Sequence, residues 1–169
     1  MLLKDKICVI TGGASGIGKG IALCMAKEGA SVAILDLNDD QGKKTLQEIK
    51  SHNVKGLYIN SDVTNPDSLT KAQEKISAEL GNTDILVVNA GISFKHSFKE
   101  VSAEEWQKVI DINLSGSFYT IKAFIDSMLD KKEDERKSII FISSGSAFTG
   151  GGGGVHYTAS KSGQHGLMR

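Results

Sequence analysis

Several residue types that mark particular classes of protein are scarce in this sequence. It has one proline, two cysteines and 6% aromatic residues, and its 20 lysines and arginines are balanced by 20 aspartates and glutamates. Because there is no excess of positive charge to hold a phosphate backbone, we expect no nucleic-acid partner. Cys8 and Cys24 stand apart in apolar segments and form no metal or redox motif.

A long hydrophobic run is also absent. The first apolar stretch follows the charges of Lys4, Asp5 and Lys6, and it is too short for a signal-peptide core or a membrane span. We therefore expect a cytoplasmic protein with no membrane partner. Charged residues of both signs at 131–137 lie between two apolar segments, which is typical of a solvated loop.

What the sequence does contain is a regular alternation of short apolar runs and segments with helical periodicity. The apolar runs are rich in valine, isoleucine and leucine without polar alternation, as in strands buried on both faces. They lie at 6–11, 31–36, 55–60, 84–89 and 138–144, and the helical segments at 16–28, 39–51, 66–80 and 102–130. Repeated strand-helix-strand units predict an α/β fold with a parallel sheet and helices on both faces.

A glycine-rich turn at residues 11–18 closes the first predicted strand and opens the first helix. Its glycines, Gly12, Gly16 and Gly18, permit a tight turn and leave the helix amides open to a pyrophosphate. Asp36 ends the second strand, where a carboxylate can accept hydrogen bonds from ribose hydroxyls and repels a 2′-phosphate. The sequence therefore predicts NAD as cofactor, and Ser15, in place of a basic residue beside the turn, supports this; an ordinary helix cap is the alternative role for Asp36.

Polar residues also follow the third and fourth strands, at the edge where open parallel sheets bind ligands. Asp62 and Val63 follow the third strand, and Asn-Ala-Gly at 89–91 follows the fourth. Plain turn chemistry is the alternative explanation for both. Five glycines at 150–154 indicate either a flexible loop or a backbone that comes close to a ligand.

Tyr157 and Lys161 lie four residues apart, and hence on one helical face, one turn from each other. A tyrosine acts as acid or base near neutral pH only when its pKa falls well below about 10, and a nearby cation stabilises the phenolate. Ser144, at the end of the fifth predicted strand, is placed to donate a hydrogen bond to a substrate oxygen.

With these residues, residues 4–169 closely resemble the short-chain dehydrogenase/reductase family. The resemblance rests on Thr11-Gly12-x-x-x-Gly16-x-Gly18, Asp62, Asn89-Ala90-Gly91, Asn113, Ser144 and Tyr157-x-x-x-Lys161, in the family's order. It implies a Rossmann-type doubly wound parallel sheet, with strand order 3-2-1-4-5 in the part present and the last strands missing. It further implies one dinucleotide-binding domain over 1–169, incomplete at its C-terminus, and a homodimer or homotetramer at full length.

The resemblance also implies a hydride transfer between a secondary alcohol or ketone and the nicotinamide ring, with Tyr157 giving or taking the hydroxyl proton. Lys161 would bind the nicotinamide ribose and lower the tyrosine pKa, Ser144 would hold the substrate oxygen, and Asn113 would fix a water in a proton relay. His156 would at most line the pocket, and His96 would face substrate. The expected cofactor-binding residues are Gly12, Ser15, Gly16, Ile17, Gly18, Asp36, Asp62, Val63, Asn89, Ala90, Gly91, Tyr157 and Lys161.

Two features depart from the family's pattern. Val88 stands where members commonly have an asparagine, which we interpret as a local packing difference. The sequence also stops at Arg169, before the family's next strand, its Pro-Gly turn, its substrate-covering segment and its last strand. We expect an exposed apolar sheet edge beside the fifth strand and a pocket without its lid.

This ending leaves a second hypothesis open, in which a shortened, non-catalytic protein binds a dinucleotide or pairs with full-length relatives. Alternatively, the sequence is part of a longer dehydrogenase, which leaves the chemistry unchanged. Within the family, sugar or polyol dehydrogenases and 3-oxoacyl-acyl-carrier-protein reductases both remain open. Asp36 argues against the NADP preference expected of the reductases.

Overall fold

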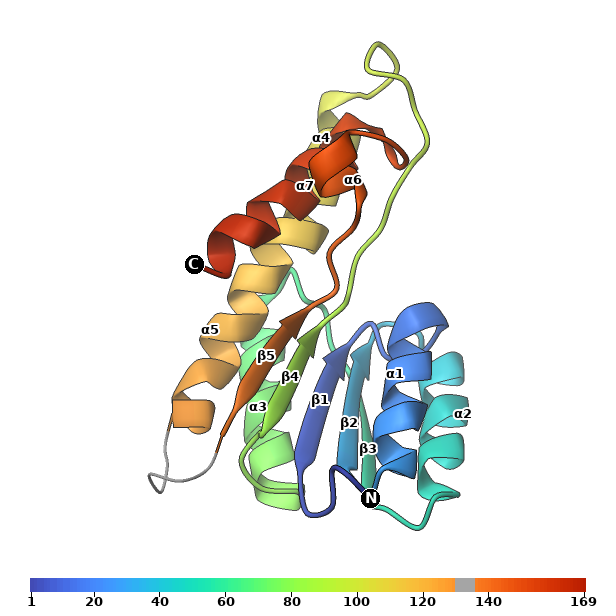
Figure 1. Cartoon of the computed structure of the whole chain (residues 1–169), viewed down its shortest axis with the longest axis vertical. Coiled ribbons are helices and arrows are strands. Elements are labelled where there is room, and N and C mark those ends of the chain that lie inside the picture. Colours follow the sequence, from blue (N-terminus) through green and yellow to red (C-terminus); the bar gives the residue numbers. More distant parts are fainter. Residues whose placement is uncertain (130–135) are drawn as a thin grey trace.

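A five-stranded parallel sheet forms the centre of the computed structural model, which describes residues 1–129 and 136–169 (Figure 1). Its strands are β1 (Ile7–Thr11), β2 (Ser31–Asp36), β3 (Gly56–Asn60), β4 (Ile85–Val88) and β5 (Ser138–Phe141). They lie in the order β3-β2-β1-β4-β5, and every pairing is parallel. This confirms the predicted doubly wound, Rossmann-type arrangement.

Helices cover both faces of the sheet because successive strand residues point to opposite sides (Figure 1). Cys8 and Ile10 of β1 pack toward α1 (Gly16–Lys27) and α2 (Asp39–Lys50). Val9, between them, packs toward α3 (Pro66–Glu79) and α5 (Gly116–Leu129). Val88 is buried on that second face, so the valine in place of an asparagine fills the core, as the packing interpretation expects.

Burial follows the position of each strand in the sheet. The inner strands β1, β2 and β4 are almost wholly buried, whereas β3 and β5 are only partly so. The prediction of burial on both faces is therefore wrong for these two strands, because each has one neighbour within the described residues. Ile140 of β5 is 40% exposed, which matches the expected apolar edge.

The predicted long helix at 102–130 is three helical segments in succession. They are α4 (Ala103–Ile110), the π-helix η1 (Asp111–Ser115) and α5, and residue 130 lies outside the described part. The π-helical turn was not predicted, since apolar spacing does not distinguish it from an α-helix. It contains Asn113, in keeping with the tendency of π-turns to occur at functional sites.

The chain after β5 forms a short helix, α6 (Ser146–Thr149), and then α7 (Gly154–Leu167), which carries Tyr157 and Lys161. Together with α4 these helices extend beyond the carboxyl edge of the sheet (Figure 1). In the glycine run before α7, Gly150, Gly152, Gly153 and Gly154 have φ between +72° and +97°. A Cβ on Gly153 would lie 2.6 Å from the Tyr157 ring, so the backbone here packs closely against a side chain of α7; a close approach to a ligand stays a prediction.

The predicted solvated loop at 131–137 is described only at its last two residues, since 131–135 lie outside the described part. Arg136 is exposed as predicted, whereas Lys137 is only 12% exposed and pairs with Asp84. The second carboxylate oxygen of Asp84 accepts the Ile7 N–H at 2.8 Å, so this pair joins the starts of β1 and β5. Cys8 is buried, as its apolar segment predicts, whereas Cys24 is exposed, so the packing that its apolar segment predicts is wrong. Across the described ranges we find no helix with the length and apolarity to span a membrane.

Phe124, on α5, is 0% exposed and belongs to the core between the sheet and α3 and α5. We expect Phe124→Ala to lower the free energy of unfolding by about 3–5 kcal/mol, because it removes buried contacts and leaves a cavity. Urea denaturation measures this change. Phe98→Ala is the control, since Phe98 is 79% exposed and its loss should change stability by less than about 0.5 kcal/mol. Equal losses in the two variants would contradict the assignment of the core.

Candidate active site

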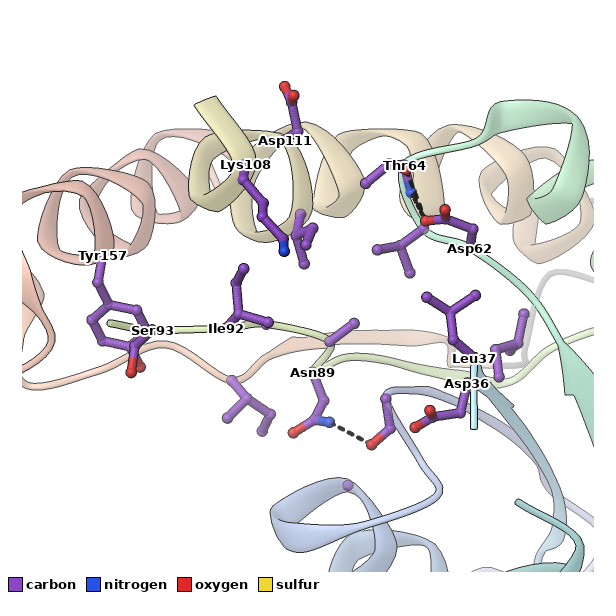
Figure 2. Close-up of a pocket in the computed structure, with 18 of the residues that line it drawn as sticks. Asp36, Leu37, Asp62, Thr64, Asn89, Ile92, Ser93, Lys108, Asp111 and Tyr157 are labelled. Atoms are coloured by element: carbon purple, nitrogen blue, oxygen red, sulfur yellow. Dashed lines mark hydrogen bonds between the residues drawn. The ribbon is translucent and has the colours of Figure 1, made fainter. Parts of the chain in front are cut away.

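A cleft of about 1460 Å³ lies at the carboxyl edge of the sheet, where α4 and α7 extend past the strand ends (Figure 2). All of the residues predicted to bind cofactor line it, namely Gly12, Ser15, Gly16, Ile17, Gly18, Asp36, Asp62, Val63, Asn89, Ala90, Gly91, Tyr157 and Lys161. Of the predicted catalytic residues, Tyr157 and Lys161 are among its lining, whereas Asn113 and Ser144 are not.

The glycine-rich turn leaves the start of α1 open to a ligand. Ser15 is the N-cap of α1, yet its side chain makes no capping hydrogen bond, and the first turn carries no acidic residue. The amide groups of this turn are therefore free to bind an anion. A Cβ on Gly18 would lie 2.2 Å from the Gly12 carbonyl oxygen, so this close packing requires glycine. Gly16, at φ +54°, faces open space.

Hydrogen bonds between the ends of β1 and β4 hold this turn in place. The Thr11 hydroxyl oxygen accepts the N–H groups of Asn89 and Ala90 at 3.0 and 3.1 Å. The Asn89 side-chain amide donates to the carbonyl oxygens of Thr11 and Gly12, at 2.9 and 3.1 Å. Asn89 thus supports the turn from the neighbouring strand as well as lining the cleft.

Asp36 is held by two backbone groups at the edge of the cleft. Its Oδ2 accepts the Ala14 N–H and its Oδ1 accepts the Asn38 N–H, both at 3.0 Å. The N-cap of α2 is Asn38, whose side chain accepts the Gln41 N–H. A helix cap therefore does not explain Asp36, and each carboxylate oxygen keeps a further lone pair for a ligand hydroxyl.

Asp62 combines turn chemistry with a place at the cleft. Its Oδ1 accepts both the N–H and the hydroxyl of Thr64, each at 2.8 Å (Figure 2). Val63, the next residue, is 9% exposed and contributes to the core below. The turn explanation is thus correct for Asp62, but the same turn also forms part of the wall.

Tyr157 and Lys161 meet on one face of α7, and the tyrosine ring points away from this helix into the cleft (Figure 2). The Lys161 ammonium lies 5.7 Å from the centroid of the Tyr157 ring and donates to the Ile142 carbonyl oxygen at 2.8 Å. Lys161 is 3% exposed, and burial lowers its pKa to about 8, because desolvation penalises the charged form.

Asn113 is fully buried and joins three segments behind the cleft. Its side chain pairs with the backbone of Ile92, accepting the N–H at 2.8 Å and donating to the carbonyl at 2.9 Å. It also donates to Ser160 Oγ on α7 at 3.1 Å. Its main-chain carbonyl accepts from Gln164 Nε2 at 2.9 Å and from Ser117 Oγ at 2.6 Å. These bonds hold η1 against α7 and the segment after β4.

The Asn113 side chain and Lys161 also face a common space. A Cβ on Gly91 would lie 3.2 Å from Asn113 Oδ1 and 3.5 Å from Lys161 Nζ. Both atoms therefore lie on the same side of Gly91, where a side chain would crowd them. Oδ1 accepts one hydrogen bond from Ile92 and, as an amide oxygen, can accept a second.

Ser144 lies just after β5, next to α6. Its hydroxyl oxygen accepts from the Ser146 N–H at 3.2 Å and from the Ser146 hydroxyl at 2.9 Å. Since a hydroxyl has two acceptor lone pairs and one proton, these bonds leave the proton of Ser144 available to a partner. The neighbouring Ser143, which the sequence did not single out, lines the cleft instead.

One wall of the cleft was missed at the level of the sequence. It comes from α4 and the start of η1, through Ala103, Glu104, Gln107, Lys108 and Asp111 (Figure 2). The available signal was a polar stripe at helical spacing within a segment expected to pack on the sheet. His156 and His96, by contrast, do not line the cleft. His156 is fully buried, within the expectation that it would at most line the pocket, whereas the expectation that His96 faces substrate finds no support in the lining.

The residues present fit a dinucleotide. The open α1 terminus suits the pyrophosphate, the fixed Asp36 carboxylate suits a ribose, and the buried Lys161 lies beside a tyrosine at the far end of the cleft. Among the described residues, no group of three or more His, Cys, Asp and Glu side chains is arranged to hold a metal ion.

Comparison with known proteins agrees with this geometry. The sequence is 36% identical over 167 residues to an acetoacetyl-CoA reductase of Synechocystis sp., covering 99% of this chain and 64% of that protein. It is 37% identical to the 3-oxoacyl-[acyl-carrier-protein] reductase of Escherichia coli, covering 100% of this chain and 67% of that protein. The chain thus spans about two thirds of the length of these relatives.

The fold matches solved structures closely. The carveol dehydrogenase of Mycobacterium avium, in complex with NAD, superposes with a TM-score of 0.93 at 28% identity, covering 99% of this chain and 65% of that one. The short chain dehydrogenase family matches residues 6–169 of the sequence. This chain therefore belongs to the short chain dehydrogenase family.

Proposed function

We propose that this protein is an NAD-dependent oxidoreductase that transfers a hydride between the nicotinamide and a secondary alcohol or ketone. The observation that carries the proposal is the pairing of Tyr157 with the buried Lys161 ammonium inside a cleft suited to a dinucleotide. The nicotinamide ring supplies or receives the hydride when the cofactor is bound. The protein positions the reactants and moves the proton.

Tyr157 is the proposed acid in reduction and the proposed base in oxidation. The Lys161 ammonium, held beside the tyrosine ring and poorly solvated, is proposed to stabilise the negative charge that develops on Tyr157 Oη during proton transfer. In reduction, Tyr157 Oη gives its proton to the carbonyl oxygen as hydride reaches the carbon. In oxidation, the same oxygen takes the proton from the alcohol.

Ser144 and Asn113 are proposed to support this step from two sides. Ser144 retains a hydroxyl proton that can be donated to the substrate oxygen, which holds that oxygen within reach of Tyr157. Asn113 Oδ1 and Lys161 Nζ lie on the same side of Gly91, and we propose that a water bound to both atoms connects them in a proton relay. Tyr157 would then regain its proton through this relay.

NAD is the proposed cofactor because of the charge at Asp36. Its carboxylate is fixed by Ala14 and Asn38, so it cannot turn away from a ligand without losing two hydrogen bonds. Ribose hydroxyls can donate to it, whereas a 2′-phosphate would meet like charge. The carveol dehydrogenase of similar fold, solved in complex with NAD, supports this choice.

The proposed substrates are carbonyl compounds and their alcohols. Two relatives are named as reductases of acetoacetyl-CoA and of 3-oxoacyl chains on acyl carrier protein, and a third protein of similar fold is a carveol dehydrogenase. The chemistry common to these names is the exchange of a carbonyl group and an alcohol. The proposal therefore goes no further than this class.

Removing the phenol hydroxyl tests the proposed mechanism. We expect Tyr157→Phe to lower turnover at least about 10³-fold, because the proton donor is lost, while NAD binding changes by less than about threefold. Absorbance of the reduced nicotinamide measures turnover, and calorimetry measures binding. Tyr58→Phe, which removes a phenol outside the cleft, is the control. Turnover near the wild-type rate in Tyr157→Phe would reject the mechanism, and NAD binding without any wild-type turnover would favour a dinucleotide-binding role.

The buried Lys161 predicts a dependence of stability on pH. Its pKa is about 8 in the folded protein, against 10.5 for a lysine side chain that is free in water. Between these values the unfolded chain binds more protons than the folded one, so this group makes unfolding harder as pH rises from 8 to 10.5. We expect the free energy of unfolding of wild type, relative to Lys161→Met, to increase by about 2–3 kcal/mol over that window. Denaturant titrations at several pH values measure this. A difference that stays constant with pH would contradict it.

Asp36 predicts the preference between cofactors. We expect Asp36→Asn to lower the ratio of the Kd for NADP to that for NAD by about tenfold or more, because like-charge repulsion of the 2′-phosphate disappears. Fluorescence titration with each cofactor measures both constants. Asp40→Asn is a matched control, since Asp40 is an exposed carboxylate in the first turn of α2. If both variants shift the ratio equally, general charge rather than contact at Asp36 sets the preference.

A further inference from the structure

A single carboxylate, Glu105 on α4, contacts two histidines that come from different parts of the chain. Its Oε1 lies 2.8 Å from Nε2 of His156, the residue immediately before Tyr157. Its Oε2 lies 2.8 Å from Nδ1 of His96, on the segment after β4. His156 is 0% exposed, and the Glu105 side chain is 18% exposed. The carboxylate therefore joins the start of α7 to α4 and to the segment that leads from β4.

The hydrogen bonds fix the tautomer of His156. A carboxylate can only accept, so His156 Nε2 carries the proton that is donated to Glu105. His156 Nδ1 in turn accepts the backbone N–H of Tyr157 at 3.0 Å. Since Nδ1 uses its lone pair in this bond, a proton there would remove the acceptor. The arrangement thus requires a neutral imidazole whose orientation Glu105 sets.

The backbone of Tyr157 is tied at a point where α7 has little other support. Gly153, the N-cap of α7, provides no side-chain cap, and four of the five glycines at 150–154 have left-handed φ angles. The His156 ring packs closely here, because a Cβ on Gly154 would lie 2.6 Å from its Cε1. The imidazole therefore supplies the first turn of α7 with a side-chain contact that its N-cap does not provide.

His156 and Glu105 do not meet substrate or cofactor directly. Neither residue lines the cleft, and the imidazole is wholly enclosed, with Phe94 packed 6.3 Å from it between ring centres. A role as general base is thus excluded by position. What these side chains can do is hold the main chain that carries Tyr157.

We propose that Glu105 and His156 are positioning residues, which set the first turn of α7 so that Tyr157 stays beside Lys161. The proposal rests on the proposed function, in which Tyr157 is the proton donor. Glu105 orients the imidazole, the imidazole holds the Tyr157 N–H, and the phenol ring is thereby kept over the Lys161 ammonium at 5.7 Å. Small errors in the position of a reacting group are costly, since a displacement of about 1 Å can lower a rate about 10²-fold.

The contact with His96 extends this control to the substrate side of the cleft. Ile92 and Ser93 line the cleft, and His96 follows them on the same segment. A Cβ on Gly154 would also lie 3.0 Å from the Phe94 carbonyl oxygen, so this segment passes directly against the start of α7. Glu105 therefore fixes the position of the segment with Ile92 and Ser93 relative to α7, the helix that carries Tyr157.

Two substitutions at each residue separate the parts of this linkage. Glu105→Gln keeps an oxygen that accepts from His156, whereas Glu105→Ala removes it. His156→Asn keeps an acceptor near the position of Nδ1 but cannot reach Glu105, and His156→Gln keeps a donor near Nε2 but not the local acceptor. Glu79→Gln, an exposed carboxylate on α3, is the matched control. Amide signals of β1 report in each case whether the fold is intact.

Nuclear magnetic resonance on the isotope-labelled chain gives readouts that do not depend on turnover. In wild type we expect His156 in the neutral form protonated at Nε2, a protected Tyr157 amide, and a nuclear Overhauser contact between the Tyr157 ring and the Lys161 side chain. In Glu105→Ala, His156→Asn and His156→Gln we expect the Tyr157 amide to exchange about tenfold faster or more, and the ring contact to weaken at least by half. Glu105→Gln and Glu79→Gln should stay within about threefold of wild type.

Turnover then connects the linkage to function. We expect the three disruptive variants to lower kcat about 10- to 100-fold with KM for NAD changed by less than about threefold, and Glu105→Gln to restore most of kcat. The proposal is overturned if Glu105→Ala or His156→Asn keeps wild-type amide exchange and ring contact, or if KM rises while kcat is unchanged. If the magnetic resonance results are as expected but wild type shows no turnover, the positioning of Tyr157 stands and the proposed function fails.

Discussion

The hydrogen bonds between Thr11 and the start of the segment after β4 are the interaction on which the site depends. Strand order reverses here, because β1 leads outward through β2 to β3 on one side, while β4 and β5 lie on the other. Connections diverge from such a point and leave a crevice above it. The Thr11 hydroxyl and the Asn89 amide close the bottom of that crevice, so the glycine turn and the segment toward Ile92 keep a fixed separation. The cleft can then be open at the top without the two halves of the sheet drifting apart.

Above this junction, hydrogen bonds between buried polar groups hold the helices in place, whereas apolar packing holds the helices against the sheet. Asn113, Ser160, Lys161 and Gln164 are almost fully buried and belong to η1 and α7. Polar groups without partners are costly to bury, and the π-turn helps to satisfy them by presenting the Asn113 carbonyl to α7, where Gln164 donates to it. Gln164 Oε1 is one of the few buried side-chain oxygens of the described part that has no protein partner. The network fixes the position of α7 relative to η1 and the sheet. Apolar contacts alone, which have no direction, would fix it less precisely.

The sequence was most informative where the signal is local. The bounds of β2 were predicted without error; the alternation of elements predicted the parallel sheet, and the family resemblance implied the strand order. All of the residues expected at the cofactor lie at the cleft. Most of them follow the ends of β1 to β4, which share one edge of the sheet, whereas Tyr157 and Lys161 lie on α7. Contacts between distant segments were not predictable in this way. The pairing of Lys137 with Asp84 has no pattern in the sequence, and the polar stripe that includes Lys108 and Asp111 does not show which surface it faces, since each depends on how β5 or α4 packs in three dimensions.

The glycine run before α7 shows why such long-range contacts matter for the chemistry. Gly153 has to lack a side chain, because its backbone packs against the Tyr157 ring, but four left-handed glycines leave the preceding chain with little intrinsic preference for one conformation. Helix α7 thus begins without the rigidity that a capping serine or aspartate would give. Lys161, one turn later, carries a charge that burial disfavours, so this residue does not itself stabilise the start of α7. The start of this helix must therefore be fixed from outside it, and the His156 side chain, oriented by Glu105 of another helix, supplies that constraint next to the residue whose position matters most.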